Sequence, residues 1–454
     1  MQTSNVFSEF ISRITEAGHS LAKGINPNEM DINNLCEHLL SRKGGATGLA
    51  IAHEILNRYD ELNDDERLDF FILLSSEFGV NTELLNSAID DWQKQGSQAE
   101  RPIHFASEPR SIELIRRLNR VSGATNRLVS MRNDLLYQIN QQSSKRKQLR
   151  LLDYDFQHLF TSWFNRGFLE LRRIDWSTSA EILERIIQYE AVHEIKGWDD
   201  LRRRVGKSNR RLYAYFHPAI NDEPLIFVEV ALLENIPGSI KTILSEDGDE
   251  NIDMKRLNTA AFYSISNCQP GLLGISFGNF LIKQAVIEIQ RELPNINQFV
   301  TLSPVPGFRK WVESLIKNNF ESVDFSQKYQ VFLETLVNAS NSVQNEENLD
   351  PEIESLLTKE DTLLQVLSYF FIIARSKKNN IIDPVARFHL DNGARLELLH
   401  KNADLSPQGI KNSWGMMVNY LYDLDHIEAN HEAFVNAGEV VASKKVNDLL
   451  KTIK

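Results

Sequence analysis

The stretch from Phe262 to Trp311 constrains the fold of this chain more than any other part of its sequence. An apolar, strand-like run starts at Phe262, and a loop with three glycines follows it. Apolar residues then recur at helical spacing from Phe280 to Leu293, before a second strand-like run that ends at Ser303. This pattern predicts a strand, a glycine-rich loop, a helix and a second strand. The free amide groups at such a helix start favour an anion, such as a phosphate group.

The composition is that of a folded protein with more than one domain. At 454 residues the chain exceeds a single ordinary core, so we expect two or three domains. Apolar residues make up 42% and charged residues 25% of the sequence, as in globular proteins. The net charge of -12 argues against a general nucleic-acid-binding protein, and we expect no nucleic-acid partner. With two cysteines, Cys36 and Cys268, neither a disulfide framework nor a four-cysteine zinc site is expected.

The sequence indicates neither a membrane span nor an export signal. Its most apolar runs are much shorter than the roughly 20 residues that cross a bilayer as a helix. The first 20 residues carry Glu9 and Glu16 and lack the basic start and apolar core of a secretory signal. We therefore expect a cytoplasmic protein with no membrane partner.

The two halves of the chain differ in the secondary structure that their apolar spacing predicts. Residues 1–166 show helical spacing almost throughout and no cluster of catalytic residues, so we expect a helical bundle that mediates homo-oligomerisation. Strands begin after residue 166, with Arg211–Phe216 and Leu225–Leu233 predicting an antiparallel hairpin. Residues 381–424 are predicted to form a loop, strands and a turn. The expected fold class is α+β, with an all-helical N-terminal bundle before a mixed α/β catalytic domain at residues 167–454.

One motif within the central stretch matches the nucleophile elbow of α/β-hydrolases. Gly274 to Gly278 reads G-x-S-x-G with Ser276 at its centre, and Asp383 and His389 follow in the order of a catalytic triad. The hydrolase fold requires several parallel strand–helix–strand units before the elbow, whereas the preceding half of this chain is helical. A serine in a packing or ligand-facing loop is therefore the favoured interpretation.

The same glycines also match a phosphate-binding loop. Gln269 to Gly274, followed by Gly278-Asn279 and a helix, is similar to the loop of GNAT-type acyltransferases that holds the pyrophosphate of coenzyme A. No G-K-[ST] follows, which excludes a Walker loop, and the dinucleotide-binding fingerprint lacks its strand–helix–strand context. Glycines that only shape a tight turn explain the pattern about equally well.

Ser303 and His389 are the remaining candidates for chemistry. Pro304 and Pro306 follow Ser303 and stiffen the chain where the predicted strand ends. His389 lies between apolar neighbours just before a predicted turn, where a single histidine is most often structural. Their spacing in the sequence does not bring the two residues together.

From Gly167 to Tyr422 the sequence resembles the catalytic domain of the malonyl-CoA decarboxylase family. The resemblance rests on six blocks in the same order as in that family: FYSIS (262–266), GNFLIK (278–283), LSPVPGF (302–308), PVARFHL (384–390), NGA (392–394) and NYLY (419–422). It implies a helical bundle followed by a GNAT-like α+β domain, assembled as a dimer or, more usually, a homotetramer. The implied activity is that of a carboxy-lyase of fatty acid metabolism, which converts malonyl-CoA to acetyl-CoA and CO2 without a metal or organic cofactor.

The resemblance also assigns site residues. It makes Ser303 and His389 catalytic, and it associates Ser264 and Tyr422 with the site. The malonyl-CoA-binding loop is implied to consist of Leu273, Gly274, Ile275, Ser276, Phe277, Gly278 and Asn279. Some family members carry a carboxylate where this chain has Ser276, so no acid is expected to act at that position here.

Decarboxylation of a malonyl thioester produces an enolate, which needs a proton at carbon and donors at oxygen. We therefore expect His389 to donate that proton and Ser303 to orient the malonyl carboxylate, with Lys283 or Lys310 adding positive charge at the pyrophosphate. Two alternatives remain at this point. One is acetyl transfer from acetyl-CoA to an amine, and the other is a regulator that binds coenzyme A without turnover.

Overall fold

The computed structural model describes residues 30–41, 45–220, 222–245, 253–275, 279–342, 355–357, 361–377 and 379–453. The chain divides into two compact units. The first, the helical unit, comprises Met1–Glu170 with two short later segments, Phe216–Leu225 and Cys268–Phe277. The second, the sheet unit, comprises Leu171–Tyr215, Ile226–Asn267 and Gly278–Lys454. The division into domains at residues 166 and 167 stays a prediction, because the helical unit also includes chain from beyond that point.

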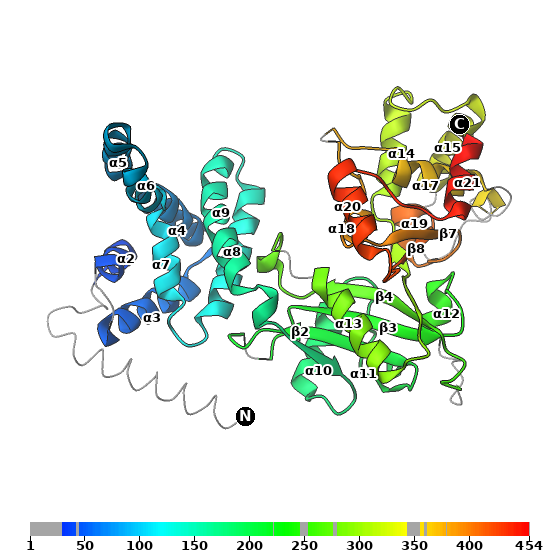
Figure 1. Ribbon diagram of the computed structural model, residues 1–454, viewed down its shortest axis with the longest axis horizontal. Coiled ribbons are helices and arrows are strands. Elements are labelled where there is room, and N and C mark those ends of the chain that lie inside the picture. The colour runs from blue at the N-terminus through cyan, green and yellow to red at the C-terminus, as the bar shows by residue number, and fades with distance from the viewer. Residues whose placement is uncertain are drawn as a thin grey trace. The chain divides into compact units, whose positions relative to one another are not determined.

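Helices that pack side by side build the helical unit (Figure 1). Asn63 shows how the sequence sets one boundary, since its side chain accepts hydrogen bonds from the backbone of Asp65 and Glu66 and Glu66 bonds back in a capping box. The described helices are α2 (Ile32–Ser41), α3 (Ala46–Glu61), α4 (Asp64–Glu77), α5 (Thr82–Gln95), α6 (Glu100–Ser107), α7 (Arg110–Leu118), α8 (Ala124–Gln141) and α9 (Arg146–Trp163).

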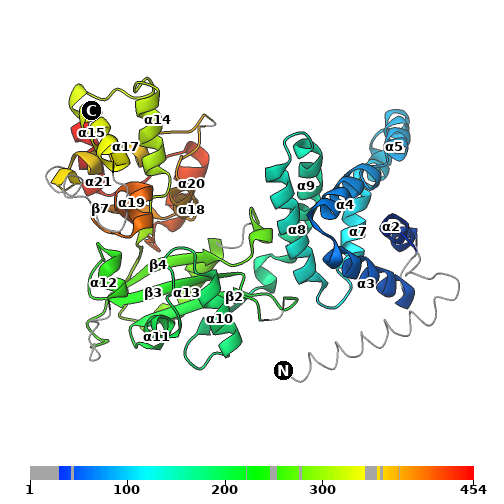
Figure 2. The same cartoon turned by 180° about the vertical axis from the view of Figure 1, so that it is seen from behind.

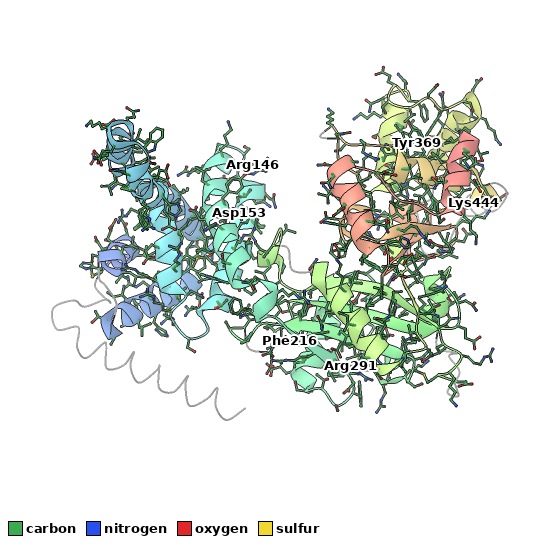
Figure 3. All side chains as sticks on the ribbon, in the orientation of Figure 1. Arg146, Asp153, Phe216, Arg291, Tyr369 and Lys444 are labelled. Atoms are coloured by element: carbon green, nitrogen blue, oxygen red, sulfur yellow. The ribbon has the colours of Figure 1, made fainter. Side chains whose placement is uncertain are left out.

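The short segment Cys268–Phe277 belongs to the helical unit and packs against α8. A Cβ atom on Gly271 would lie 1.9 Å from the carbonyl oxygen of Val129, so only glycine fits at this position. Arg132 of α8 donates to the Gly271 carbonyl at 2.6 Å and to Asp153 of α9 at 2.8 Å (Asp153 is labelled in Figure 3). One glycine of the predicted loop is therefore needed for packing against a helix.

An eight-stranded mixed sheet forms the centre of the sheet unit, in the order β1-β2-β3-β4-β5-β8-β6, with β7 also paired to β8. The predicted hairpin is confirmed, because β2 and β3 pair antiparallel from Arg210↔Ala231 to Tyr215↔Ile226. The strands are β1 (Glu170–Ile174), β2 (Arg210–Phe216), β3 (Ile226–Leu233), β4 (Thr259–Asn267), β5 (Gln298–Thr301), β6 (Ser303–Pro304), β7 (Arg395–His400) and β8 (Met417–Leu421). Together with the helical N-terminal region, this mixed sheet confirms the α+β expectation.

The predicted strand, loop, helix and strand are β4, the glycine loop, α13 (Asn279–Glu292) and β5. β4 and β5 run parallel, and their pairing extends from Thr259↔Gln298 to Phe262↔Thr301. Beyond that pair β4 continues along β3, whereas the chain that follows β5 pairs with β8 at Ser303↔Val418. The two strands therefore diverge immediately before Ser303.

Helices surround the C-terminal strands of the sheet unit (Figure 2). One of them corrects the expectation for residues 381–424, because Pro384–Asp391 is a helix, α18, rather than loop or strand. Asp383 caps it by accepting from the Ala386 backbone at 2.8 Å, and Pro384 occupies its first turn. The other described helices of the sheet unit are α10 (Ala180–Tyr189), α11 (Trp198–Gly206), α12 (Ile240–Leu244), α14 (Phe308–Lys317), α15 (Gln327–Ser342), α17 (Thr362–Ile372), α19 (Pro407–Ser413), α20 (Ile427–Ala437) and α21 (Lys444–Ile453). Of these, α10 and α11 lie beside β2 and β3.

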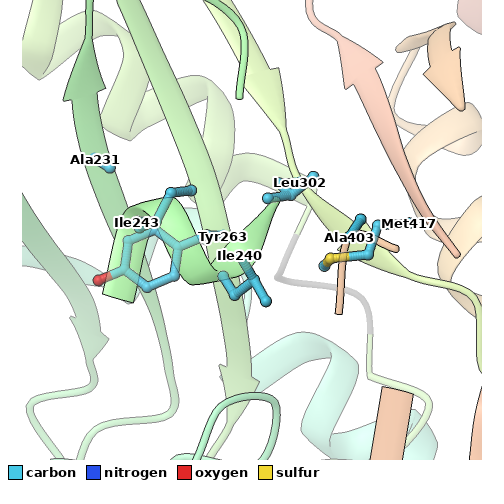
Figure 4. Close-up of a cluster of buried hydrophobic side chains, with 7 residues drawn as sticks. All are labelled: Ala231, Ile240, Ile243, Tyr263, Leu302, Ala403 and Met417. Carbon is cyan, nitrogen blue, oxygen red and sulfur yellow. The ribbon is translucent and has the colours of Figure 1, made fainter. Parts of the chain in front are cut away.

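A buried apolar cluster fixes the strands that later carry the candidate site. Tyr263 of β4, Leu302 between β5 and β6, and Met417 of β8 pack together with Ala231, Ile240, Ile243 and Ala403 (Figure 4). Each large apolar side chain buried in this way contributes about 1.5–3 kcal/mol. The cluster therefore holds β4, β6 and β8 in a defined arrangement. None of the described helices is both long enough and apolar enough to cross a membrane.

Candidate active site

Ser303 occupies a buried position at the start of β6, with the residue 5% exposed. Its hydroxyl donates to the Thr301 hydroxyl at 2.9 Å. The Ser303 Oγ atom also lies 3.1 Å from Nε2 of His389, 86 residues further along the chain. The fold thus brings together the two residues that sequence spacing left apart.

His389 projects from α18 into the sheet unit and is 1% exposed. Its Nδ1 atom lies 2.8 Å from the hydroxyl of Tyr422, so both ring nitrogens have partners. The ring stacks on Tyr420, with 4.6 Å between the ring centroids and 27° between the planes. Burial lowers the pKa of His389 to about 3. The imidazole is therefore neutral at physiological pH in the free protein.

Tyr422 directs the tautomer of that imidazole. The residue follows β8, and its backbone N–H donates to the Phe299 carbonyl at 2.8 Å, which fixes its position beside β5. Burial raises the pKa of the Tyr422 hydroxyl well above its usual value, so this group keeps its proton and can donate to Nδ1 of His389. With Tyr422 as the donor to Nδ1, the imidazole proton is on Nε2 and faces Ser303, whose own hydroxyl donates to Thr301. We call Thr301, Ser303, His389 and Tyr422 the Ser–His chain.

Asp383 does not act as the third member of a triad. Its carboxylate accepts from the backbone N–H groups of Ala386 and Gly307, at 2.8 and 3.1 Å. Burial raises its pKa to about 6, and the two backbone donors oppose that shift. Because Nδ1 of His389 faces Tyr422, the Asp–His pair that the hydrolase interpretation requires is not formed. Asp383 instead fixes the start of α18 against the turn that follows Ser303.

The predicted malonyl-CoA-binding loop is only partly described. Leu273 is 69% exposed, Gly274 has a φ of +82°, and Ile275 is buried. Ser276, Phe277 and Gly278 lie outside the described residues, and α13 begins at Asn279. The assignment of this loop to the substrate therefore stays a prediction.

Ser264 lies on β4, is 2% exposed, and hydrogen-bonds a carboxylate. Its hydroxyl is 2.8 Å from both oxygens of Glu190, which follows α10. Glu190 also accepts from the hydroxyl of Ser266 at 3.1 Å and from the backbone N–H groups of Val192 and His193 at 2.9 and 2.7 Å. The contacts of Ser264 thus join β4 to the segment between α10 and α11.

Three further ionisable residues extend this arrangement, and with Glu190 we call them the charged cluster: Asp200, Arg204 and Glu229. Arg204 donates to Asp200 at 3.1 Å and to Glu229 at 3.3 Å. Burial, followed by the neighbouring charge of Glu190, raises the pKa of Glu229 to about 8. Glu229 therefore carries a proton at neutral pH, which lets two carboxyl groups lie side by side away from water.

Sequence reasoning missed several of these residues. Glu229 interrupts the otherwise apolar run of β3, and that single charge was the available signal for the charged cluster. Thr301 and Tyr420 each stand two residues before a predicted site residue, a spacing that places side chains on one face of a strand. Among the described residues, no group of three or more His, Cys, Asp or Glu side chains could hold a metal ion.

Comparison with known proteins identifies relatives over most of the chain. Residues 167–454 match the malonyl-CoA decarboxylase C-terminal domain, and residues 78–164 match the malonyl-CoA decarboxylase N-terminal domain. The mitochondrial malonyl-CoA decarboxylase of Anser anser anser is 34% identical over 369 residues, covering 78% of this chain and 72% of that protein. Its counterpart in Rattus norvegicus is 32% identical and covers 78% and 73%, respectively.

Solved structures extend the comparison to the fold. The malonyl-CoA decarboxylase from Agrobacterium vitis is 47% identical with a TM-score of 0.84, and the alignment covers 93% of this chain and all of that one. The enzyme from Rhodopseudomonas palustris is 45% identical with a TM-score of 0.83 over the same shares. The C-terminal family match alone spans more than half of the sequence. This chain belongs to the malonyl-CoA decarboxylase family, a family of carboxy-lyases.

Proposed function

We propose that the chain decarboxylates malonyl-CoA to acetyl-CoA and CO2, and that Ser303 and His389 carry the reaction. The observation that supports this most strongly is the 3.1 Å contact between Ser303 Oγ and His389 Nε2 in a buried site. Family membership supports the substrate and the reaction class. The partners of both ring nitrogens support a role for His389 in holding and moving a proton.

The reaction begins with cleavage of the bond between the malonyl carboxylate and the α-carbon. CO2 leaves, and the electron pair of the broken bond remains as an enolate, with much of its charge on the thioester oxygen. Preorganised donors in a site that excludes water stabilise such charge best. We assign Ser303 to orient the carboxylate, because its hydroxyl faces Nε2 of His389 and can turn its proton from Thr301 to the bound carboxylate. It need not act as a covalent nucleophile.

The proton for the α-carbon is assigned to Nε2 of His389. The free imidazole is neutral because it is buried, yet a malonyl carboxylate bound beside Ser303 favours the imidazolium. The substrate thus raises the pKa of its own proton donor. The imidazolium forms by uptake of one solvent proton on binding. Nε2 then gives its proton to the α-carbon, which forms the new C–H bond of acetyl-CoA, and the ring returns to the neutral state of the free protein.

Tyr422 can accompany His389 through both protonation states. A phenol hydroxyl donates one hydrogen bond and accepts others. It therefore donates to Nδ1 of the neutral imidazole and accepts from Nδ1–H of the imidazolium at the same 2.8 Å contact. A carboxylate in this position would favour the imidazolium already in the free protein, whereas a tyrosine leaves the change of state to the substrate.

The loop from Leu273 to Asn279 is proposed to hold the coenzyme A pyrophosphate through its amides at the start of α13. Of the two lysines considered as supplements, Lys283 forms an ion pair with Glu428 at 3.1 Å, which reduces its value for a phosphate. Backbone amides are therefore the main proposed contacts of the pyrophosphate.

Incubation with malonyl-CoA alone tests the proposed function. We expect release of CO2 and acetyl-CoA in equal amounts without an amine acceptor. An acetyltransferase would produce nothing under these conditions, and a regulator would bind the ligand without turnover. Binding without CO2 release therefore contradicts the proposal.

Two serine variants test where the reaction takes place. Ser303→Ala is expected to lower turnover about 100-fold, the size of effect seen when one preorganised polar group is removed from a reacting centre. Ser276→Ala is the matched control, since it changes the serine of the G-x-S-x-G motif. Full activity of Ser303→Ala with an inactive Ser276→Ala would restore the nucleophile-elbow interpretation.

We also propose that the helical unit mediates homo-oligomerisation. Large apolar side chains stay exposed on its helices: Leu84, Trp92, Phe105, Leu151 and Tyr154 are each 44–73% exposed. Exposed apolar groups of this size commonly mark association surfaces. Light scattering of the purified protein measures the assembly, and a monomer would contradict the proposal. The choice between dimer and tetramer, the cytoplasmic location and the role in fatty acid metabolism stay predictions.

A further inference from the structure

Aromatic rings surround the imidazole of His389. The ring of Tyr420 lies nearly parallel to it, with 4.6 Å between the two centroids and 27° between the planes. The rings of Phe388 and Tyr422 meet it at 74° and 76°, with centroid distances of 5.1 and 6.1 Å. Of these rings, Tyr420 is therefore the one whose face covers the imidazole.

Neither ring nitrogen of His389 meets a carboxylate among the residues that the structure describes, because Nε2 faces Ser303 and Nδ1 faces Tyr422. β6 and β8, which approach the ring from the sheet, contain no charged residue. The titratable side chains of α18 and of α20, which packs against α18, bond to backbone or to other side chains, line a surface cleft, or are exposed: Asp383, Arg387, Asp391, Glu428, His431 and Glu432. Burial is accordingly the cause of the lowered pKa of His389.

The ring of Tyr420 is held in place on several sides. Its backbone N–H donates to the hydroxyl of Thr301 at 3.2 Å, and its register with Leu396 pairs β8 with β7. Phe371 of α17 stands against the ring at 80°, with 6.4 Å between the centroids. Tyr420 and His389 are both buried, so the two rings meet away from water in a fixed geometry.

We propose that the face of Tyr420 stabilises the imidazolium form of His389 by a cation–π interaction. The ring then takes the role that the aspartate has in a Ser–His–Asp triad, where a carboxylate stabilises the imidazolium. The inference rests on the proposed function, because it concerns the proton donor of the same reaction. Tyr420 acts through His389 rather than on the substrate, so it is a positioning residue.

The charge distribution of an aromatic ring distinguishes the two protonation states of His389. The face of a tyrosine ring is negative and attracts a cation that lies within about 6 Å of its centroid. The imidazole of His389 lies within that distance at 4.6 Å, and the attraction is stronger where water is excluded. A neutral imidazole has no net charge to be attracted. The stacked ring therefore favours the imidazolium and opposes part of the effect of burial.

The competing explanation is that Tyr420 only fills space beside His389. Loss of its ring would then leave a cavity and loosen the site, which lowers activity by a similar factor at every pH. Loss of a cation–π interaction instead lowers the pKa of His389 in the substrate complex, so the effect on activity depends on pH. That effect also depends on the charge distribution of the ring and not only on its shape.

The pH profile of kcat for malonyl-CoA separates these explanations, because kcat reports the protonation states of the substrate complex. Tyr420→Leu removes the ring face and keeps an apolar side chain. We expect the alkaline limb of its profile, where His389 loses its proton, to move about one unit towards lower pH. This shift lowers kcat about tenfold on the alkaline side, a loss that shrinks as the pH falls through the midpoint. Tyr420→Phe retains the ring and should recover most of the shift.

Phe371→Leu is the matched control, since it removes another buried ring, one that contacts Tyr420. We expect the midpoint of its alkaline limb to stay at the wild-type value. An unshifted limb in Tyr420→Leu, a loss of the same size at every pH, or an equal shift in Phe371→Leu overturns the inference.

A second measurement keeps the shape of the ring, in case Tyr420→Leu does not fold. Phenylalanine and its analogues with one, two and three ring fluorines are incorporated in place of Tyr420, because fluorine withdraws negative charge from the ring face with little change of volume. We expect the midpoint of the alkaline limb to fall with each fluorine, by about one unit over the series. A midpoint that does not depend on the number of fluorines overturns the inference.

The proposed function and this inference fail in different ways. Wild-type protein that releases no CO2 from malonyl-CoA overturns both. Normal turnover with a midpoint that does not follow the fluorine series overturns the inference alone.

Discussion

Two buried polar clusters lie within the sheet unit, and they are built on opposite principles. The charged cluster places a buried arginine between carboxyl groups, with Arg204 bonded to the Asp200 carboxylate and to Glu229. The Ser–His chain contains only neutral groups, joined by single hydrogen bonds from Thr301 to Tyr422. The side chains of the charged cluster already bond to one another and leave no group for a charged ligand. In the Ser–His chain, His389 meets an opposite charge only when a ligand binds.

The two clusters therefore suit different tasks, one the positioning of a backbone segment and the other a change of protonation state. A buried ion pair costs desolvation and gives mainly a defined geometry, which suits the segment that carries His193. A buried neutral histidine, in contrast, responds strongly to a new charge because water does not screen it. We therefore assign positioning to the charged cluster and proton transfer to His389.

The largest expected effect is the loss of turnover in His389→Gln. Removal of a general acid typically costs 10²–10⁴-fold, and we expect kcat for malonyl-CoA to fall about 1,000-fold. Coenzyme A binding, measured by calorimetry, should stay unchanged because the variant retains a polar side chain of similar size. His426→Gln is the control, since His426 is exposed and outside the Ser–His chain. Turnover at the wild-type rate in His389→Gln would remove His389 from the mechanism.

Breaking the charged cluster should instead destabilise the fold. Arg204→Met leaves Asp200 and Glu229 without their buried cation, and we expect the free energy of unfolding to fall by about 3–5 kcal/mol in chemical denaturation. Arg203→Met is the matched control, because the Arg203 side chain is 34% exposed and a surface ion pair contributes about 0–1 kcal/mol. Equal losses for the two variants would show that the cluster has no special structural role.

Tyr422→Phe should produce a smaller effect that is confined to activity. The variant removes the hydroxyl that directs the proton of His389 to Nε2, and we expect kcat to fall about tenfold. Tyr420→Phe provides the control, since Tyr420 stacks on the same imidazole and its hydroxyl has no hydrogen-bond partner in the described part of the chain. If Tyr420→Phe lost as much activity as Tyr422→Phe, the hydrogen bond to Nδ1 would not explain the effect.

The pH dependence of stability should have opposite signs for the two clusters. Folding lowers the pKa of His389 from 6.5 to about 3, so the unfolded chain binds more protons and stability falls as the pH drops from 6.5 towards 3. Folding raises the pKa of Glu229 from 4.5 to about 8, so its contribution is present below pH 4.5 and is lost as the pH rises to 8.

Each group adds a slope of at most about 1.4 kcal/mol per pH unit. Denaturation measured from pH 4 to pH 8 should show that His389→Gln flattens the acid side of the profile. Glu229→Gln, which mimics the protonated carboxyl group, should flatten the alkaline side. Unchanged slopes in both variants would contradict the assigned protonation states.

The comparison also shows what the sequence could predict. Apolar spacing predicted the hairpin of β2 and β3 and the unit from β4 to β5. Burial of one face gives long strands and helices a regular spacing of apolar residues, which the sequence shows directly. Ser303 and His389 were identified through blocks that resemble one family. Their contact could not be predicted from spacing, since it depends on how β6 and α18 meet 86 residues apart.

Two kinds of feature escaped prediction for physical reasons. The eight residues of α18 are too few to show a helical period, and its cap at Asp383 resembles an ordinary turn signal. In the charged cluster, Glu190 follows α10, Arg204 lies on α11 and Glu229 lies on β3. Glu190 and Arg204 alone are typical of a surface, and only tertiary packing makes them partners of Glu229.

Proton uptake on ligand binding reports directly on the charge state of His389. His389 is neutral in the free protein, and we propose that the malonyl carboxylate charges it. The ligand for the test is the amide analogue of malonyl-CoA, in which nitrogen replaces the sulfur and decarboxylation is slow. Calorimetry in two buffers of different ionisation enthalpy measures the protons bound. We predict uptake of about one proton per site with this analogue at pH 7, and none with acetyl-CoA or in His389→Gln. Absence of uptake with the analogue in the wild-type protein would contradict this proposal.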